Sequence, residues 1–307
     1  MKDLKKTVPT LLTLFFAWQV FGQPETAGRE PDAGQQIKEM MIPAGGVTLH
    51  ARIAGNMSAG KVLLAVNGGP GQSSRYMVSL ERLANAERCV VTYDQRGTGQ
   101  SSRPSDGYDL LKYVEDLDAV RQAVGAKSIH ILGHSWGGIV AMRYATIHPE
   151  RVDSLILAGA GPPSWEASRE GQAKLGQRIG LLQTEGVIPN PLPDSTERVL
   201  EAILPAYFAD PRFKIPEELK KTPFNEETYQ QTLAAAGNWD FSADVKKLTH
   251  RILILWGEQD PFGPGMAEGT KNTLANARVK FVLLKGCGHY WLECPEEFFN
   301  QVRGFLE

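Results

Sequence analysis

Hydrophobic positions along the chain form short runs that predict two kinds of strand. Residues 39–42 and 47–53 are typical of two strands joined by a turn at Gly45 and Gly46, which predicts a β-hairpin. Further along, unbroken apolar runs alternate with helical patterns, as in a parallel sheet that helices cover on both faces. We expect these parallel strands at residues 61–66, 89–93, 128–132, 152–157, 251–256 and 279–284. The predicted fold class is therefore α/β.

Residues 161–243 interrupt this alternation. They contain no apolar run of the buried-strand kind, but they carry apolar residues at helical spacing, such as Leu175 and Leu182. We expect a helical cap inserted between two strands of the sheet. The core of the fold is then formed by residues 37–160 and 244–307.

Residues 1–36 follow a different pattern. Three lysines precede an apolar stretch over residues 8–21, and Gly22 stands directly before a suitable cleavage position. This predicts a secretory signal peptide at residues 1–22 and a polar linker at residues 23–36. The longest unbroken apolar run is much shorter than the ~20 residues that span a bilayer. An amphipathic membrane anchor is the alternative. The signal peptide predicts a secreted or periplasmic protein with no stable membrane insertion after cleavage.

Composition and charge narrow the class of partner. Of the 307 residues, 42% are hydrophobic and 22% are charged, close to the average for soluble globular proteins. Lysine and arginine total 33 against 35 aspartates and glutamates, and the net charge of −2 gives no basic footprint for nucleic acid. The sequence therefore favours a small-molecule or short-peptide substrate over a nucleic-acid partner, and it leaves the oligomeric state open.

The three cysteines are too few for a disulfide scaffold and lack the spacing of metal ligands. Cys89 lies in an apolar run and is expected to be a small buried residue. Cys287 and Cys294 can form a disulfide in an oxidising compartment or stay reduced, and the sequence leaves both open. We expect no metal site and no cofactor.

The strongest chemical signal is the segment Gly-His-Ser-Trp-Gly at residues 133–137, which follows one predicted strand and precedes a helix. Such a turn presents a serine hydroxyl on a strained backbone. Its flanking positions must be glycine, because the helix packs too closely for a Cβ atom. Ser135 is therefore the predicted nucleophile.

A serine nucleophile needs a base and an acid that orients the base. Asp260 and His289 each follow a predicted strand, at the carboxyl ends where α/β sheets place their sites. Ser, Asp and His also occur in the chain order expected of this architecture. Glu258 is the alternative orienting acid. The remaining histidines are expected to pack or hydrogen-bond rather than react, and they are His50, His130, His134, His148 and His250.

A glycine-rich loop, Asn-Gly-Gly-Pro-Gly, follows the first parallel strand at residues 67–71. Backbone N–H groups of such a loop can reach the charge that builds on a substrate oxygen during acyl transfer. Gly69 and Trp136, the residue after the nucleophile, are the predicted oxyanion donors. A phosphate-binding loop is excluded, because no Gly-Lys-Ser/Thr follows. Residues 94–101 predict a structural turn behind this loop.

Together these motifs make the chain resemble the α/β-hydrolases of the proline iminopeptidase type over nearly its whole length after the linker. The resemblance rests on the Asn-Gly-Gly-Pro-Gly loop, Asp-Gln-Arg-Gly at residues 94–97, Gly-His-Ser-Trp-Gly-Gly at residues 133–138, Asp260 and His289. It implies an eight-stranded sheet with a helical cap, and a serine enzyme that cleaves after an N-terminal residue. Asn67 departs from the histidine that this family usually has there.

We therefore expect a serine hydrolase that acts through an acyl-enzyme, in the first place an aminopeptidase. The resemblance implies that cap glutamates hold the free amine of the substrate, and the candidates are Glu166, Glu170, Glu226 and Glu227. A carboxylesterase or lactonase acting on small esters is the alternative within the same chemistry. A non-catalytic binding protein on a hydrolase scaffold is the alternative of another class.

Overall fold

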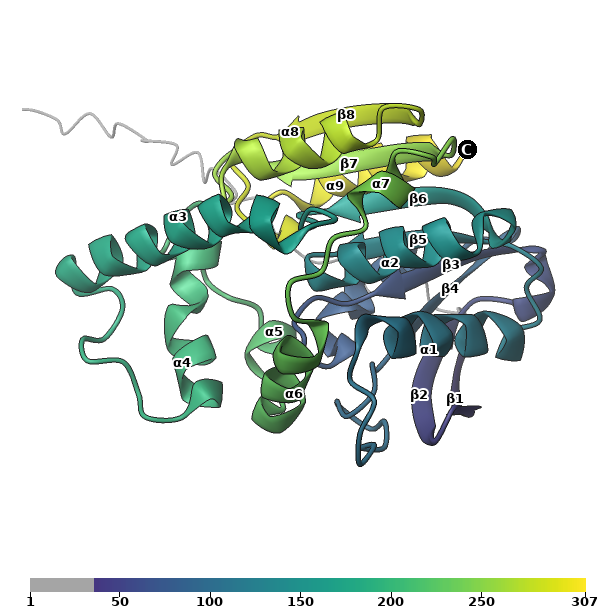
Figure 1. The fold of residues 1–307 in the computed structure, drawn as a ribbon, viewed down its shortest axis with the longest axis horizontal. Coiled ribbons are helices and arrows are strands. Elements are labelled where there is room, and N and C mark those ends of the chain that lie inside the picture. The colour runs from purple at the N-terminus through teal and green to yellow at the C-terminus, as the bar shows by residue number, and fades with distance from the viewer. Residues whose placement is uncertain (1–35) are drawn as a thin grey trace, which may run out of the picture. The chain divides into compact units, whose positions relative to one another are not determined.

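Eight strands form one mixed sheet in the computed structural model, which describes residues 36–307 (Figure 1). They are β1 (Ile37–Ala44), β2 (Val47–Ala54), β3 (Lys61–Val66), β4 (Arg88–Tyr93), β5 (Ile129–His134), β6 (Val152–Ala158), β7 (Arg251–Gly257) and β8 (Arg278–Leu284). Their spatial order is β1-β2-β4-β3-β5-β6-β7-β8. β1 pairs antiparallel with β2, and β2 with β4, whereas the later pairs are parallel.

This sheet confirms the predicted α/β class and its mostly parallel arrangement. The hairpin β1–β2 turns at Gly45 and Gly46, whose φ angles of +46° and +91° favour glycine. The continuous apolar runs became the buried strands β3 to β7, because a strand covered on both faces needs apolar side chains in both directions.

Helices cover both faces of the sheet. Alternate residues of β3 face opposite sides, so that Leu64 belongs to one apolar cluster and Leu63 to the other. The first cluster includes apolar residues of α1 (Leu110–Ala123), α2 (Trp136–Ile147) and α8 (Pro264–Thr273). The second includes residues of η2 (Ser74–Leu83) and α9 (Pro295–Leu306). Figure 1 shows α1 and α2 in front of the strands.

The cap is the helical segment between β6 and β7, where the sequence predicts an insertion at residues 161–243. It contains α3 (Trp165–Thr184), α4 (Thr196–Ile203), α5 (Glu217–Lys220), α6 (Glu226–Ala236) and α7 (Ser242–Val245). Ser164, Ser195 and Asn225 cap the starts of α3, α4 and α6, since each side chain accepts a backbone N–H of the first turn. Helices α3 to α6 extend from one end of the sheet, whereas α7 lies against α2 (Figure 1). Cap and core belong to one compact unit.

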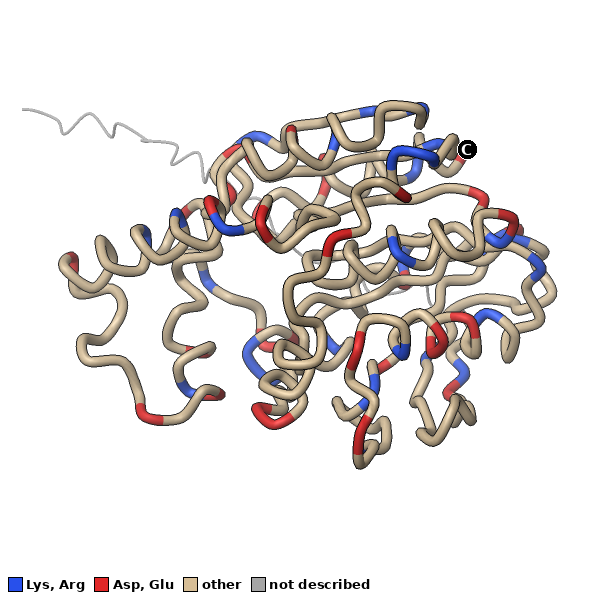
Figure 2. The backbone as a smooth tube through the Cα atoms, in the orientation of Figure 1, with Lys and Arg blue, Asp and Glu red and all other residues tan. Residues whose placement is uncertain are grey.

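Acidic and basic residues are interspersed over both the core and the cap of the described chain (Figure 2). Within residues 36–307, no helix is long and apolar enough to cross a membrane. The predicted signal peptide and most of the linker lie outside the described residues.

Candidate active site

Ser135 stands at the turn between β5 and α2. Its φ of 52° and ψ of −119° make it the one non-glycine residue with positive φ in the described chain. Its N–H donates to the carbonyl of Ala158 at 3.0 Å. At Gly137 a Cβ atom would lie 2.1 Å from the carbonyl oxygen of Val66, so only glycine fits there. The structure therefore has the strand–turn–helix that presents a serine hydroxyl.

Asp260 follows β7 and His289 follows β8, and their side chains meet. His289 Nδ1 lies 2.8 Å from Asp260 Oδ2, and the two side chains are 3% and 0% exposed. Asp260 Oδ1 also accepts the N–H of Phe262 at 3.0 Å. Because the aspartate binds Nδ1, Nε2 of His289 is left for the nucleophile. Glu258, the alternative acid, is exposed.

The glycine-rich loop passes beside the nucleophile. A Cβ atom on Gly68 would lie 3.0 Å from Ser135 Cβ. The N–H of Gly68 donates to Tyr76 Oη at 2.6 Å, whereas within residues 36–307 the N–H groups of Gly69 and Trp136 make no hydrogen bond. Trp136 is the first residue of α2, where backbone N–H groups have no partner within the helix. The two predicted oxyanion donors are therefore free to bind a substrate oxygen.

A hydrogen-bond network holds this loop from behind. Asn67 Nδ2 donates to the carbonyls of Gly68 (2.9 Å) and Gln72 (2.7 Å), which fixes both ends of the loop. Gln95 Nε2 donates to the backbone and side-chain oxygens of Asn67, at 2.7 and 3.2 Å, and Gln95 Oε1 accepts the indole N–H of Trp136 at 3.2 Å. The sequence predicts only a turn at Gln95, and the structure shows that this turn supports the oxyanion loop.

The same turn also holds the cap. The carbonyl of Gly97 accepts hydrogen bonds from Asn225 Nδ2 at 3.0 Å and from Thr228 Oγ1 at 2.9 Å, both at the start of α6. A side chain at Gly97 would collide with Thr228, because its Cβ would lie 2.3 Å from Thr228 Oγ1. One core turn thus positions both the oxyanion loop and helix α6.

Three of the other histidines contact side-chain or backbone groups of the core. His130 Nδ1 lies 2.8 Å from Ser154 Oγ, and His250 Nε2 lies 2.9 Å from the carbonyl oxygen of Pro149. His50 Nδ1 is 3.4 Å from Asp94 Oδ2. These contacts agree with the packing roles that the sequence predicts.

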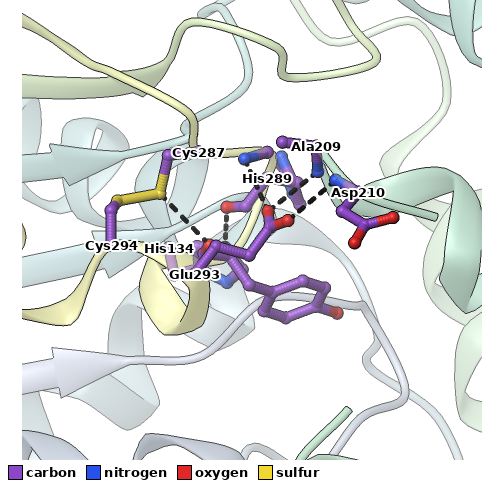
Figure 3. The surroundings of a disulfide bond; sticks show 9 residues. His134, Ala209, Asp210, Cys287, His289, Glu293 and Cys294 are labelled. Carbon is purple, nitrogen blue, oxygen red and sulfur yellow. Dashed lines mark hydrogen bonds between the residues drawn. A yellow bond between two sulfur atoms is a disulfide. The ribbon is translucent and has the colours of Figure 1, made fainter. Parts of the chain in front are cut away.

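A disulfide closes the loop that carries His289. Cys287 and Cys294 are bonded across it, which resolves the alternative that the sequence left open (Figure 3). Cys89 is a free, buried cysteine of β4, as expected. The bridge limits the conformations of the segment that positions the predicted base.

Glu293 ties this loop to the cap. Its carboxylate accepts the backbone N–H groups of Gly288 (2.8 Å), Ala209 (2.8 Å) and Asp210 (3.0 Å) (Figure 3). Three N–H donors on one carboxylate form a strong, charge-assisted set. Two of its three partners lie more than 80 positions away in the chain, so no local sequence pattern indicates this role of Glu293.

A cavity of about 280 Å³ lies between the cap and the core. Ser135, Trp136, His289, Gly68 and Gly69 form its floor on the core side. The cap side combines apolar and polar residues; the apolar ones include Trp165, Leu200, Leu204, Phe224, Leu233 and Trp239, and the polar ones include Gln172 and Lys220. Apolar walls with a few polar groups are typical of a site for a small ligand.

At least one of the four candidate cap glutamates was expected to face the nucleophile, but none of them lines this cavity. Three of them form exposed ion pairs, Glu166 with Arg169, Glu170 with Lys174 and Glu227 with Arg103, and Glu226 accepts a hydrogen bond from Thr196. The prediction was wrong, because a helix position alone does not tell which face meets the cavity.

Two other acids line the cavity instead. Glu197 and Glu201 are one turn apart on α4, and Leu200 and Leu204 of the same segment also line it. The helical spacing of these four residues was visible in the sequence and could have indicated one face. Among residues 36–307, no group of His, Cys, Asp and Glu is arranged to hold a metal ion.

A serine on a strand–helix turn, followed along the chain by an aspartate and a histidine at the ends of later strands, defines the α/β-hydrolase class. The family model for the alpha/beta hydrolase fold matches residues 61–293, so the chain belongs to this family. It is a hydrolase of the serine type.

Known relatives make the resemblance more specific. Proline iminopeptidase of Lactobacillus delbrueckii subsp. bulgaricus is 30% identical over 280 residues, with 83% of this chain and 92% of the relative covered. The crystal structure of proline iminopeptidase from Mycobacterium smegmatis aligns with a TM-score of 0.67 at 22% identity, covering 88% of this chain and 97% of that chain. An esterase from Exiguobacterium antarcticum aligns with a TM-score of 0.64 at 22% identity, covering 88% and 100%. The resemblance to the proline iminopeptidase type is confirmed, and the two structures support the fold alone.

Proposed function

We propose that this hydrolase is an aminopeptidase that releases the N-terminal residue of short peptides through an acyl-enzyme. The observation that carries the proposal is the cavity that brings Ser135 and His289 together with two carboxylates of the cap, Glu197 and Glu201. The sequence similarity to a proline iminopeptidase supports it.

The chemistry follows from the geometry. Ser135 Oγ attacks the substrate carbonyl, and Nε2 of His289 takes the serine proton while Asp260 stabilises the ring through Nδ1. The N–H groups of Gly69 and Trp136 bind the oxyanion. The protonated histidine then gives its proton to the leaving amine, and a water activated by the same histidine cleaves the acyl-enzyme and restores the serine.

The cap acids give this chemistry a preference for a free amine. An ammonium group that enters the cavity loses part of its hydration, which is costly unless a carboxylate pairs with it. Glu197 and Glu201 are the carboxylates that line this cavity, and both lie on one face of α4. We infer that they bind the substrate's N-terminal ammonium.

Substrate pairs test this proposal. Aminoacyl anilides with a free amine are expected to be cleaved, and their N-acetylated counterparts are expected to lose most of kcat/KM. Glu197→Gln and Glu201→Gln should raise KM for the free amine. Glu170→Gln is the matched control, because Glu170 is paired with Lys174 at the surface (2.7 Å) and lies outside the cavity lining. Equal cleavage of acetylated and free substrates would reject the aminopeptidase.

A carboxylesterase or lactonase is the second candidate. The aromatic and aliphatic cap wall around Trp165, Leu233 and Trp239 favours it, since an ester without an amine needs only an apolar pocket. Short-chain nitrophenyl esters cleaved in preference to all anilides would establish this function instead. A non-catalytic binding protein predicts no labelling of Ser135 by a fluorophosphonate.

We also propose that the protein is secreted or periplasmic. The pattern of residues 1–22 supports export, and the bridge between Cys287 and Cys294 suits an oxidising compartment. Mass spectrometry of the protein from expressing cells should then find a chain that starts at Gln23, in the periplasm or the medium. An intact Met1 in a cytoplasmic fraction would contradict the proposal.

A further inference from the structure

One buried histidine beside Ser135 has no role in the chemistry described so far. His134 is 1% exposed and makes hydrogen bonds from both ring nitrogens. Nδ1 lies 2.7 Å from Tyr76 Oη, and Nε2 lies 3.2 Å from the carbonyl oxygen of His289. Figure 3 shows His134 beside the loop of His289. A buried polar side chain with both ends bonded holds its partners in fixed positions.

The N–H of Gly68 sets the direction of these hydrogen bonds. It donates to Tyr76 Oη at 2.6 Å, so the phenol donates its own proton to Nδ1 of His134. The histidine proton must then be on Nε2, from which it is donated to the carbonyl of His289.

The charge states of the two side chains agree with this assignment. Burial, and next the nearby ring of His289, hold the pKa of His134 well below its ordinary value, so the ring is neutral. Burial raises the pKa of Tyr76 well above its ordinary value, so the phenol keeps its proton. The rings of Tyr290 and Trp291 pack on His134, with centroids 5.1 and 5.3 Å away.

We propose that Tyr76 and His134 are positioning residues that couple the oxyanion loop to the catalytic base. One end of their hydrogen-bond chain is the residue before Gly69, and the other end is the backbone of His289. Ser135 directly follows His134 in the chain. The buried ring of His134 is therefore connected to the oxyanion loop and to the base by hydrogen bonds, and to the nucleophile by the backbone. This role rests on the proposed function. Tyr76 lies outside the cavity lining, and His134, which is part of it, acts here through its two hydrogen bonds.

Tyr76→Phe tests the chain with the smallest change, because it removes the hydroxyl and keeps the ring. The expected result is a fall in kcat of roughly tenfold to a hundredfold with KM unchanged, since small displacements of reacting groups are costly and Tyr76 is not part of the cavity wall. Tyr93→Phe is the matched control. Tyr93 is also a buried phenol, but within residues 36–307 its hydroxyl has no hydrogen-bond partner, so its kinetics should not change.

Two variants at His134 separate positioning from packing. The oxygen and nitrogen of a glutamine side chain can accept from Tyr76 and donate to the carbonyl of His289, whereas a leucine can do neither. His134→Gln is expected to keep most of the wild-type kcat, and His134→Leu is expected to lose at least tenfold. The positioning role is judged by this difference in kcat and not by the unfolding temperatures of the two variants.

The outcomes distinguish this role from the proposed function. Fluorophosphonate labelling of the wild type, but not of Ser135→Ala, supports Ser135 as the nucleophile. If Tyr76→Phe is then labelled as fast as the wild type, or if the Gln and Leu variants have equal kcat, the positioning role is overturned and the function stands. A wild-type protein that is not labelled at Ser135 overturns both.

Discussion

Replacing Ser135 by glycine is expected to stabilise the protein while it abolishes activity. Ser135 has φ 52° and ψ −119°, a conformation in which a Cβ atom crowds the backbone. Glycine adopts it without that cost. Ser135→Ala is the matched comparison, because it also removes the hydroxyl but keeps the Cβ atom.

Two opposing effects set the magnitude. A residue held in such a backbone conformation costs about 1–3 kcal/mol. Glycine also lowers the stability by about 0.5–1 kcal/mol relative to alanine, because it gives the unfolded chain more conformational freedom. Ser135→Gly should therefore be about 1 kcal/mol more stable than Ser135→Ala. For a domain of this size that difference raises Tm by about 2 °C.

Thermal unfolding of both variants, with a second pair at an unstrained position, measures this effect. Ser168 lies within helix α3, where glycine should be about 1 kcal/mol less stable than alanine. The sign of the glycine–alanine difference is thus expected to reverse between positions 135 and 168. If glycine destabilises position 135 as much as position 168, the turn stores no strain and the reasoning is refuted.

Three further predictions concern stability. Arg96→Met should destabilise the fold by about 3–5 kcal/mol in denaturant titrations, because it leaves the buried carboxylate of Asp116 without its partner at 2.7 Å. Reduction of the Cys287–Cys294 bridge should lower unfolding stability by about 2.5 kcal/mol, the chain entropy of its short loop, measured with and without reductant. Burial opposes the ionisation of Asp118, but hydrogen bonds outweigh it and lower its pKa. The stability from this group should therefore be present above about pH 4 and be lost as the pH falls below it, whereas Asp118→Asn should show a flatter acid limb. The groups that lower this pKa are Arg121, Tyr144, Gln122 and Arg151.

The centre of the sheet could be predicted from the sequence because strands β3 to β7 are buried on both faces. The predicted run at residues 61–66 coincides with β3, and the other parallel strands differ from prediction by a residue or two at their ends. β1 is longer than the predicted 39–42, since it extends over Ile37–Ala44. It is an edge strand with exposed positions, and hydrophobicity alone does not show where such a strand begins.

For the cap, the sequence pattern predicted the helices but not which side of each helix faces the cavity. Glu170 and Glu201 are both exposed acids on cap helices, yet only Glu201 lines the cavity. A cap helix packs partly on other cap segments and partly over the cavity, so its apolar stripe does not identify the side that meets the substrate. Only the packing of α3 against the core helix α8 and the position of α4 beside the cavity make that distinction.

Asn67 shows how a departure from a family pattern can preserve a site. One carboxamide nitrogen carries two protons, and Asn67 uses them to bind the carbonyls of Gly68 and Gln72 at once. A single imidazole nitrogen donates only one. The carboxamide oxygen of Asn67 remains as an acceptor, and Gln95, 28 positions away, donates to this oxygen. Gln95 also accepts a hydrogen bond from the indole of Trp136. Asn67 therefore holds the oxyanion loop together with Gln95, a partner distant in the chain. Asparagine can take the place of histidine at position 67 because Gln95 binds its carboxamide oxygen.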